Sequence, residues 1–352
     1  MWLSKYVSRI TGRDASAATT AQIWFWARVS AVHKPRRDRV VGDRAAMGDD
    51  GIIMKRLVFR RTIRMIERIR SRMDRLSLLL QRFSLSAGAF YSGQICGVHN
   101  FERDTQRGHV HLVKRGPVKL TGGRDGTLRI TEPSLLFMPR PDTHRLVADD
   151  RDGADVVCAS ILFGGGGRNP ITDSLPSLVL VPLAELPGAQ ALLELLYAEA
   201  FSERCGRQAA LDRLCELLLI RLLRHCMDQG ITQGGTLAGL ADARLAKALV
   251  ALHEDPTRPW QLADMAALAG MSRARFAAHF REITGDTPAD YLATWRITLA
   301  QGLLRTGRPL KHVAIEVGYG SSSALTRAFI RKIGQPPTHW LRQSLAAEST
   351  AS

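Results

Sequence analysis

The sequence feature that most limits the possible folds is a motif that occurs twice in the last third of the chain. Its serine, apolar, glycine, proline and aromatic positions all recur at an offset of 49 residues. The first copy contains Ser272, Phe276, Phe280, Gly285, Pro288 and Tyr291, and the second contains Ser321, Leu325, Phe329, Gly334, Pro337 and Trp340. Such internal similarity predicts one supersecondary unit used twice.

Each copy has the pattern of two helices joined by a tight turn. In the first copy, apolar residues at helical spacing run from Leu262 to Ala269, and Gly270 supplies the backbone freedom of a sharp turn. Ser272 can cap the next helix, in which Phe276 and Phe280 point back towards the first helix. The second copy repeats this order, and a helix that starts at Thr287-Pro288 connects the two units.

Paired helices of this kind predict DNA binding. The second helix of such a unit fits the major groove, where the base edges carry distinct donors and acceptors. Two units on a stiff connecting helix would meet one face of the duplex about one turn apart, roughly 34 Å. A helical repeat without a nucleic-acid role is the alternative. The outward faces favour DNA, because they carry arginines and short donors rather than acids.

Residues 241–345 resemble the DNA-binding domain of the AraC/XylS family of bacterial transcription regulators. The resemblance covers nearly the whole of this region and rests on both copies of the motif. Further residues that carry it are Pro259-Trp260-Gln261-Leu262, Gly270-Met271-Ser272, Trp295-Arg296, Gly318-Tyr319 and Pro336-Pro337. It implies binding to double-stranded promoter DNA and activation by contact with RNA polymerase.

The resemblance also implies which side chains read bases. In the second unit these are Ser322, Ser323, Thr326 and Arg327. The first unit departs from many family members, because Ala277 and Ala278 stand where a polar side chain is common. Alanine offers only a methyl contact, for example to thymine. We therefore expect Arg273 and Arg275 to supply the readout of the first unit.

The middle of the chain has a different pattern. Residues 73–180 contain short segments rich in β-branched residues between Gly, Pro and Asp clusters, which predicts an all-β barrel or jelly roll. Residues 181–228 contain two leucine-rich helices, and the second is apolar on more than one side. Such a helix must be buried against the barrel, a second subunit or both, and we expect this segment to mediate dimerisation. Residues 229–240 include four glycines and predict a linker.

This middle part resembles the cupin-type sensor domain of one branch of the same family. The resemblance is looser and rests on residues such as Gly97, Pro139-Arg140-Pro141-Asp142, Asn169-Pro170 and Leu175-Pro176. It implies a small-molecule effector of unknown identity and a homodimer. The side chains expected to line the effector pocket are His109, His111, His144, Arg145 and Cys158.

Cupins often hold metals, and His109 and His111 lie on one face of a predicted strand with His144 as a possible third ligand. The glutamate that metal cupins carry after the histidine pair is missing, and Lys114 and Arg115 stand there instead. Because positive charges beside a cation are unfavourable, we expect no metal and no other cofactor. The alternative to metal ligation is that these histidines are hydrogen-bonded and line a pocket.

The net charge of +16 is unevenly distributed. Residues 1–72 hold 17 Lys and Arg against 6 Asp and Glu, whereas residues 73–240 hold 18 of each. The basic run from Lys55 to Arg72 could form a helix that binds nucleic acid or a membrane surface. We favour a disordered tail, or an extension upstream of a native start at Met73.

The remaining features exclude several classes of protein. No apolar run reaches the ~18 residues of a membrane span, and the five cysteines are widely spaced without a CxxC pair, which favours a cytoplasmic protein. No catalytic set stands out, so an enzyme is not expected. The prediction is an α+β multidomain protein: an all-β cupin-like barrel with helices, then an all-α domain with two helix-turn-helix motifs at 241–345. Two other functions remain open, a metal-dependent cupin enzyme fused to a DNA-binding domain and an effector-independent DNA-binding protein.

Overall fold

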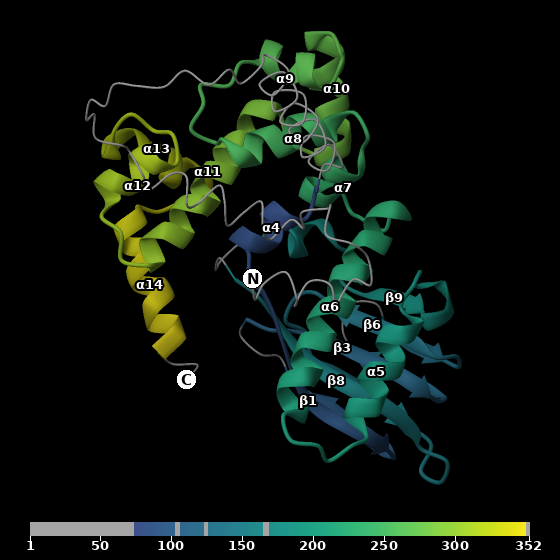
Figure 1. The fold of residues 1–352 in the computed structure, drawn as a ribbon. Coiled ribbons are helices and arrows are strands. Elements are labelled where there is room, and N and C mark those ends of the chain that lie inside the picture. Colours follow the sequence, from purple (N-terminus) through teal and green to yellow (C-terminus); the bar gives the residue numbers. More distant parts are fainter. Residues whose placement is uncertain (1–73, 103–105, 123–125, 165–168, 350–352) are drawn as a thin grey trace, which may run out of the picture. The chain divides into compact units, whose positions relative to one another are not determined.

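The computed structural model describes residues 74–102, 106–122, 126–164 and 169–349. The basic segment 1–72 and the proposed start at Met73 lie outside these described residues. We refer to residues 74–228 as the barrel domain and to residues 235–349 as the helical domain. The barrel domain contains the predicted antiparallel β structure with helices, and the helical domain that follows contains the predicted helices (Figure 1).

The barrel domain consists of two antiparallel sheets that enclose an apolar interior. The strand order is β1-β8-β3-β6-β9 in the larger sheet and β2-β7-β4-β5 in the smaller one. The strands are β1 Leu85–Ile95, β2 Gly97–Phe101, β3 Gly108–Arg115, β4 Val118–Gly122, β5 Leu128–Ile130, β6 Ser134–Met138, β7 His144–Ala148, β8 Ala154–Phe163 and β9 Val179–Pro182. Strand β9 extends beyond the boundary at residue 180 that the sequence pattern predicts, because it pairs with β6 at the sheet edge.

Strand β3 shows how the two faces of the larger sheet are divided. Val110 and Leu112 belong to the apolar cluster on the outer face, whereas Val113 belongs to the cluster between the sheets. This alternation follows from the period of two of a β-strand. His109 and His111 share the inner face with Val113 and are therefore enclosed by the barrel domain.

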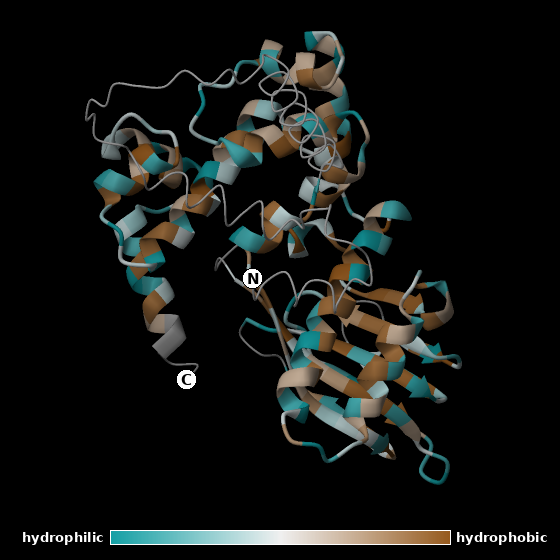
Figure 2. Cartoon of the chain, viewed as in Figure 1, coloured by the Kyte–Doolittle hydropathy of each residue, from teal (hydrophilic) through white to brown (hydrophobic). Residues whose placement is uncertain are grey.

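Helices cover the outer face of the larger sheet. Helix α5 (Gln190–Ala200) packs against α6 (Arg207–Asp228), and α6 packs against β1 (Figure 1). Apolar residues are concentrated along the strands, and the strand-connecting loops are mostly hydrophilic (Figure 2). Cys215 and Cys226 of α6 are buried in this layer. The short elements η1 (Thr172–Ser174), η2 (Leu183–Glu185) and α4 (Ser77–Arg82) complete the domain.

The helical domain contains the two predicted helix-turn-helix units. The first is α9 (Leu262–Leu268) with α10 (Arg273–Thr284), and the second is α12 (Leu310–Glu316) with α13 (Ser322–Ile333). Helix α11 (Pro288–Arg305) connects them, α8 (Leu245–Glu254) precedes them and α14 (Pro337–Ser349) follows. None of the helices in the described ranges is both long and apolar enough to cross a membrane.

The second half of the predicted linker is helical. Helix α7 (Gly235–Ala241) begins inside the predicted linker, and its residues Leu237 and Leu240 are fully buried. Gly234 and Gly235 take positive φ angles at its start, so glycines serve here as helix entry rather than as a flexible tether. The two buried leucines were the sequence signal for this helix, but the surrounding glycines obscured it.

Candidate DNA-binding surface and barrel interior

Local sequence signals set the two ends of each second helix. Ser272 Oγ accepts the backbone N–H of Arg275 at 3.4 Å, and Ser321 Oγ accepts that of Ala324 at 3.2 Å. The same helices end at Gly285 and Gly334, whose φ angles of 82° and 88° are left-handed. The repeat seen in the sequence is therefore a repeat of caps and turns in the structure.

Buried aromatic and leucine side chains orient these helices. Phe276 and Phe280 of α10, and Leu325 and Phe329 of α13, are fully buried. Because side chains three or four residues apart share one helix face, the residues between them point outward. Each second helix thus presents a fixed face to solvent.

The structure places the predicted base-reading residues on those outward faces. Arg273 and Arg275 of α10 are exposed, as are Ser323 and Arg327 of α13. Ser322 and Thr326 are half-buried beside them. No carboxylate of the described residues forms an ion pair with Arg273, Arg275 or Arg327. These guanidinium groups can therefore take phosphate oxygens or guanine edges.

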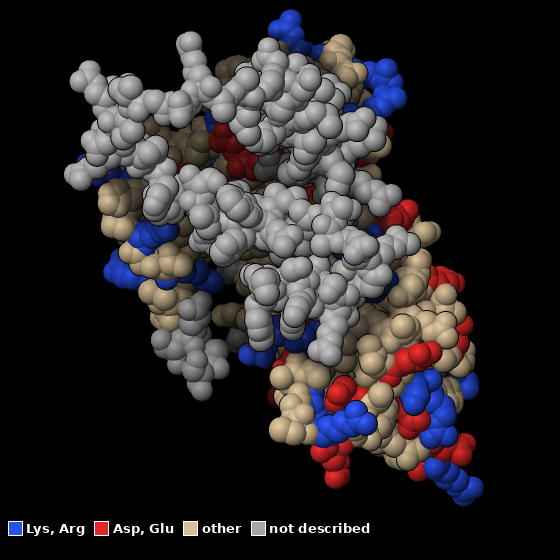
Figure 3. Space-filling model, viewed as in Figure 1, with Lys and Arg blue, Asp and Glu red and all other residues tan. Residues whose placement is uncertain are grey.

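Charged side chains are distributed differently over the two domains that the structure describes. In Figure 3, Lys and Arg side chains stand out beside α10, whereas positive and negative side chains are interspersed over the barrel domain. A positive field over one domain favours approach of a polyanion to that domain.

Arg296 of α11 connects the loop ahead of the first unit to the turn of the second unit. Its Nε donates to the carbonyl oxygen of Pro256 at 2.7 Å and its Nη2 to that of Arg258 at 3.0 Å, both ahead of α9. Its guanidinium also lies 5.7 Å from the ring centre of Tyr319, in the turn of the second unit. Arg296 is among the residues that carry the family resemblance, which implies no role for it. Only its contacts show that it connects the loop ahead of α9 to the turn of the second unit.

A second connection holds the first recognition helix. His279 Nε2 of α10 lies 2.9 Å from Asp242 Oδ2, and Asp242 also accepts the backbone N–H groups of Arg244 and Leu245. Burial by itself would raise the pKa of Asp242, but these hydrogen bonds lower it below its ordinary value. Asp242 and His279 are 37 residues apart in the sequence, so no local pattern predicts this contact.

In the barrel domain, the structure gathers three of the predicted pocket residues. The ring centres of His109, His111 and His144 lie 5.0–6.0 Å from one another, and the ring of Phe101 stacks on His144 at 5.0 Å. Cys158 pairs with His111 across β3 and β8 and is also buried. This histidine cluster is a polar group inside an otherwise apolar interior.

Arg145 does not join the histidine cluster, contrary to our expectation. It lies between His144 and Leu146 on β7, both of which are buried, whereas Arg145 is exposed. The alternation of a β-strand turns its side chain to the outer face of the smaller sheet. The expected pocket therefore lacks its cationic member.

Burial keeps His111 and His144 of this cluster neutral. Burial lowers the pKa of His144 to about 4, and burial together with its two neighbours lowers that of His111 well below its ordinary value. His144 Nδ1 lies 3.3 Å from the carbonyl oxygen of Asp142, and its Nε2 lies 2.8 Å from His111 Nε2. If Nδ1–H donates to that carbonyl, His144 Nε2 is the acceptor for His111 Nε2–H.

This arrangement does not fit a metal centre. The Nε2 atoms of His111 and His144 are directed at each other, and the described residues contain no group of three side chains placed to hold an ion. Burial raises the pKa of Cys158, so its thiol stays protonated. Our argument that Lys114 and Arg115 would place positive charge beside a bound metal was nevertheless wrong. Lys114 lies over the rings of Tyr197 and Phe201 outside the barrel, and Arg115 pairs with Asp155.

Comparisons with known proteins agree with both domains. Residues 74–228 match the family described as Cupin, and residues 265–343 match the family described as Helix-turn-helix domain. The HTH-type transcriptional regulator AlkR of Acinetobacter baylyi is 34% identical over 308 residues, which are 77% of this chain and 100% of that protein. A Streptomyces lividans protein described as an AraC-like transcription regulator is 33% identical over 293 residues, 75% of this chain and 95% of its own length.

One solved structure that matches this chain is that of ToxT from Vibrio cholerae O395. It is 13% identical to this chain, the match covers 75% of this chain and 98% of ToxT, and the TM-score is 0.34. Family membership rests on the two closer sequence relatives, since they align with about three quarters of the chain. The chain belongs to the AraC family of DNA-binding transcription regulators and carries a cupin-like domain ahead of its two helix-turn-helix units.

Proposed function

We propose that the chain acts in the cytoplasm as a homodimeric regulator rather than as an enzyme. Helices α10 and α13 bind double-stranded promoter DNA, a small effector sets the arrangement of the domains, and the bound protein contacts RNA polymerase. One observation carries the DNA-binding part. Arg273 and Arg327 are exposed on the outward faces of the second helices of the two units.

Contacts between the barrel and helical domains support effector control. Ser174 Oγ accepts the backbone N–H of Leu237 at 3.1 Å, and Arg75 donates to the carbonyl oxygen of Leu240 at 2.9 Å. Phe83 packs edge-to-face on Trp295 of α11 at 5.7 Å. An effector that binds more tightly to one arrangement of these contacts shifts the population towards it.

Two leucines on the helical layer support a homodimer. Leu195 of α5 is 59% exposed and Leu217 of α6 is 45% exposed, while the other leucines of these two helices are buried or half-buried. Exposed apolar side chains on adjacent helices favour packing against a second apolar surface. A second copy of the chain would supply an identical pair of helices across a twofold axis.

The experiment compares Arg327→Ala with wild type on DNA sequences that the full chain selects from a random library. A lost bidentate base contact is worth about 1–3 kcal/mol, so specific affinity should fall about tenfold or more. Affinity for unrelated DNA should change little. Arg151→Ala is the matched control, because Arg151 is an exposed arginine in the turn between β7 and β8.

An equal loss on selected and unrelated DNA would contradict base reading by Arg327. In that case Arg327 would contact only phosphate. The slope of log affinity against log salt concentration would then be shallower by about one in Arg327→Ala. A chain that selects no sequence from the library at all would contradict the proposed function as a whole.

A further inference from the structure

The outward faces of helices α10 and α13 differ in where their charged side chains lie. Both helices are 12 residues long and start after a capping serine, so their positions correspond at the offset of the repeat. Successive residues of an α-helix point about 100° apart. Ala274 of α10 and Ser323 of α13 therefore occupy the same place, exposed in the first turn and on the side away from the core.

The centre of the outward face of α10 offers no hydrogen-bonding group in its first two turns. Three alanines occupy it, Ala274, Ala277 and Ala278. The corresponding residues of α13 are all polar, namely Ser323, Thr326 and Arg327. Base pairs in the major groove differ chiefly in their donors and acceptors, and a methyl group can contact only the thymine methyl. Base reading by hydrogen bonds is therefore available to the centre of α13 and not to that of α10.

Two arginines flank the alanines of α10. Arg273 and Arg275 precede and follow Ala274, so they point about 100° to either side of it. Both are exposed, and neither guanidinium forms a hydrogen bond or an ion pair with another described residue. A recognition helix in the major groove turns its centre to the base edges and its flanks to the phosphate chains that border the groove. Each of these arginines then faces one phosphate chain.

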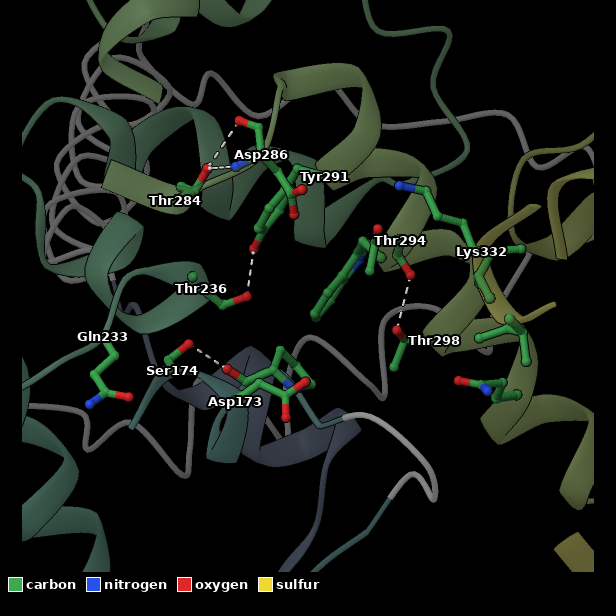
Figure 4. A pocket seen from close by; sticks show the side chains of 16 residues that line it. Asp173, Ser174, Gln233, Thr236, Thr284, Asp286, Tyr291, Thr294, Thr298 and Lys332 are labelled. Carbon is green, nitrogen blue, oxygen red and sulfur yellow. Dashed lines mark hydrogen bonds between the residues drawn. The ribbon is translucent and has the colours of Figure 1, made fainter. Parts of the chain in front are cut away.

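The matching flanks of α13 carry no charge. The residues that correspond to Arg273 and Arg275 are Ser322 and Ala324, both half-buried. Lys332, near the end of α13, lines a cavity beside α11 (Figure 4), and its Nζ lies 3.3 Å from Asp290 Oδ1 of that helix. Paired flanking cations in the first turn are therefore a property of α10 and not of α13.

The last turns of both helices carry charge as well, but farther from the bases. Arg281 of α10 and Arg331 of α13 are exposed there. Arg281 lies about 10 Å along the helix axis from Ala274, whereas base edges are contacted by the N-terminal residues of a recognition helix. Glu282, next to Arg281, lies 3.7 Å from His279 of the same helix. The contrast between the two units thus rests on their first two turns.

We propose that the two units divide the work on DNA. Arg273 and Arg275 hold the two phosphate chains of one groove segment whatever its sequence, and Ser323 and Arg327 read bases in the other segment. For the two arginines of α10 this role differs from the base reading that we expected from the family resemblance. The proposal rests on the proposed function, because both helices must lie on DNA.

Single alanine variants test the two arginines. The full chain selects its site from a random library, and fluorescence anisotropy gives the affinity for selected DNA and for unrelated DNA of the same length. Arg273→Ala and Arg275→Ala should each weaken binding about fivefold at physiological salt, equally on both DNAs. The slope of log affinity against log salt concentration should become shallower by about one for each. Arg151→Ala, at an exposed arginine of the barrel domain, is the control and should change neither quantity.

A second experiment gives the first unit the polar centre that it lacks. The double variant Ala274→Ser, Ala278→Arg places the central pair of α13 on α10. Selection from the same library should then enrich a second base preference, roughly 34 Å or one duplex turn from the first. Ala289→Arg is the matched control, because Ala289 is exposed at the start of α11, outside both recognition helices. It should add affinity for any DNA without a new base preference.

Three results would overturn this division between the units. One is a wild-type site with equally strong base preferences in two segments one turn apart. Another is a base preference that relaxes in Arg273→Ala, Arg275→Ala or Arg281→Ala. The third is a double variant that is folded by circular dichroism and selects the same site as wild type. All three leave the proposed function intact, whereas a library without any enriched sequence would contradict both.

Discussion

Arg296 Nε donates to the backbone carbonyl of Pro256 at 2.7 Å, which ties the connecting helix to the loop ahead of α9. The same guanidinium lies over Tyr319 in the turn of the second unit, so one side chain contacts both the loop ahead of the first unit and the second unit. Burial lowers the pKa of Arg296, although an arginine remains charged. These contacts hold α11 against the segment ahead of α9 and the turn of the second unit.

Arg296→Met should destabilise the helical domain by about 2–3 kcal/mol, because two carbonyl oxygens lose a charged donor while the apolar stem is kept. Arg308→Met is the control, since Arg308 forms an exposed pair with Glu316 that is worth at most about 1 kcal/mol. Urea denaturation followed by tryptophan fluorescence measures both. Equal losses for the two variants would show that Arg296 is an ordinary surface arginine.

Alanine substitutions at three glycines of the helical domain test separately the cost of a left-handed backbone and the cost of a steric clash. Gly318→Ala should cost the most, because its φ of 91° is left-handed and a Cβ would lie 2.8 Å from Thr257 Cα. Gly270→Ala has a φ of 64° but no atom within 4 Å of its Cβ, so it should cost about 1 kcal/mol. Gly320→Ala meets neither constraint and should be nearly neutral. Denaturation midpoints that do not follow this order would contradict the close approach of the second turn to Thr257.

His253 makes the stability of the helical domain depend on pH. Burial lowers its pKa from 6.5 to about 3, so the unfolded chain binds more protons between these values. The contribution of neutral His253 to the free energy of unfolding is therefore fully present above pH 6.5. It falls as the pH decreases towards 3, by up to about 1.4 kcal/mol per pH unit. His253→Gln should flatten this slope, measured by urea denaturation at several pH values. His312→Gln, at an exposed position on α12, should leave the slope as it is.

Neighbouring leucines of α6 distinguish a dimer surface from the core. Leu218 is 1% exposed, so Leu218→Glu should destabilise the barrel domain by more than about 3 kcal/mol. Leu217→Glu places the same charge at an exposed position and should change stability by less than about 0.5 kcal/mol. If α6 mediates dimerisation, only Leu217→Glu yields a folded monomer in sedimentation analysis. A Leu217→Glu protein that sediments like wild type would remove this surface from the proposed dimer.

Sequence patterns were most informative for the helical domain, because its elements depend on local interactions. The caps at Ser272 and Ser321 and the terminal glycines at Gly285 and Gly334 each act within one turn of the helix that they bound. The strands of the barrel domain were recognised from turn residues between them, although β9 was missed. The alternation rule would also have placed Arg145 outside, had it been applied beyond the histidine motif.

The sequence by itself determined the order of the elements, the inward face of each recognition helix and the family. The tertiary structure decided which distant groups meet: His111 with His144, Asp242 with His279, and Arg296 with both Pro256 and Tyr319. It also decided that Lys114 lies away from the histidine cluster, over the rings of Tyr197 and Phe201. The physical reason is range, since periodicity and capping act between residues a few positions apart, whereas these contacts exist only once packed elements bring separate segments together.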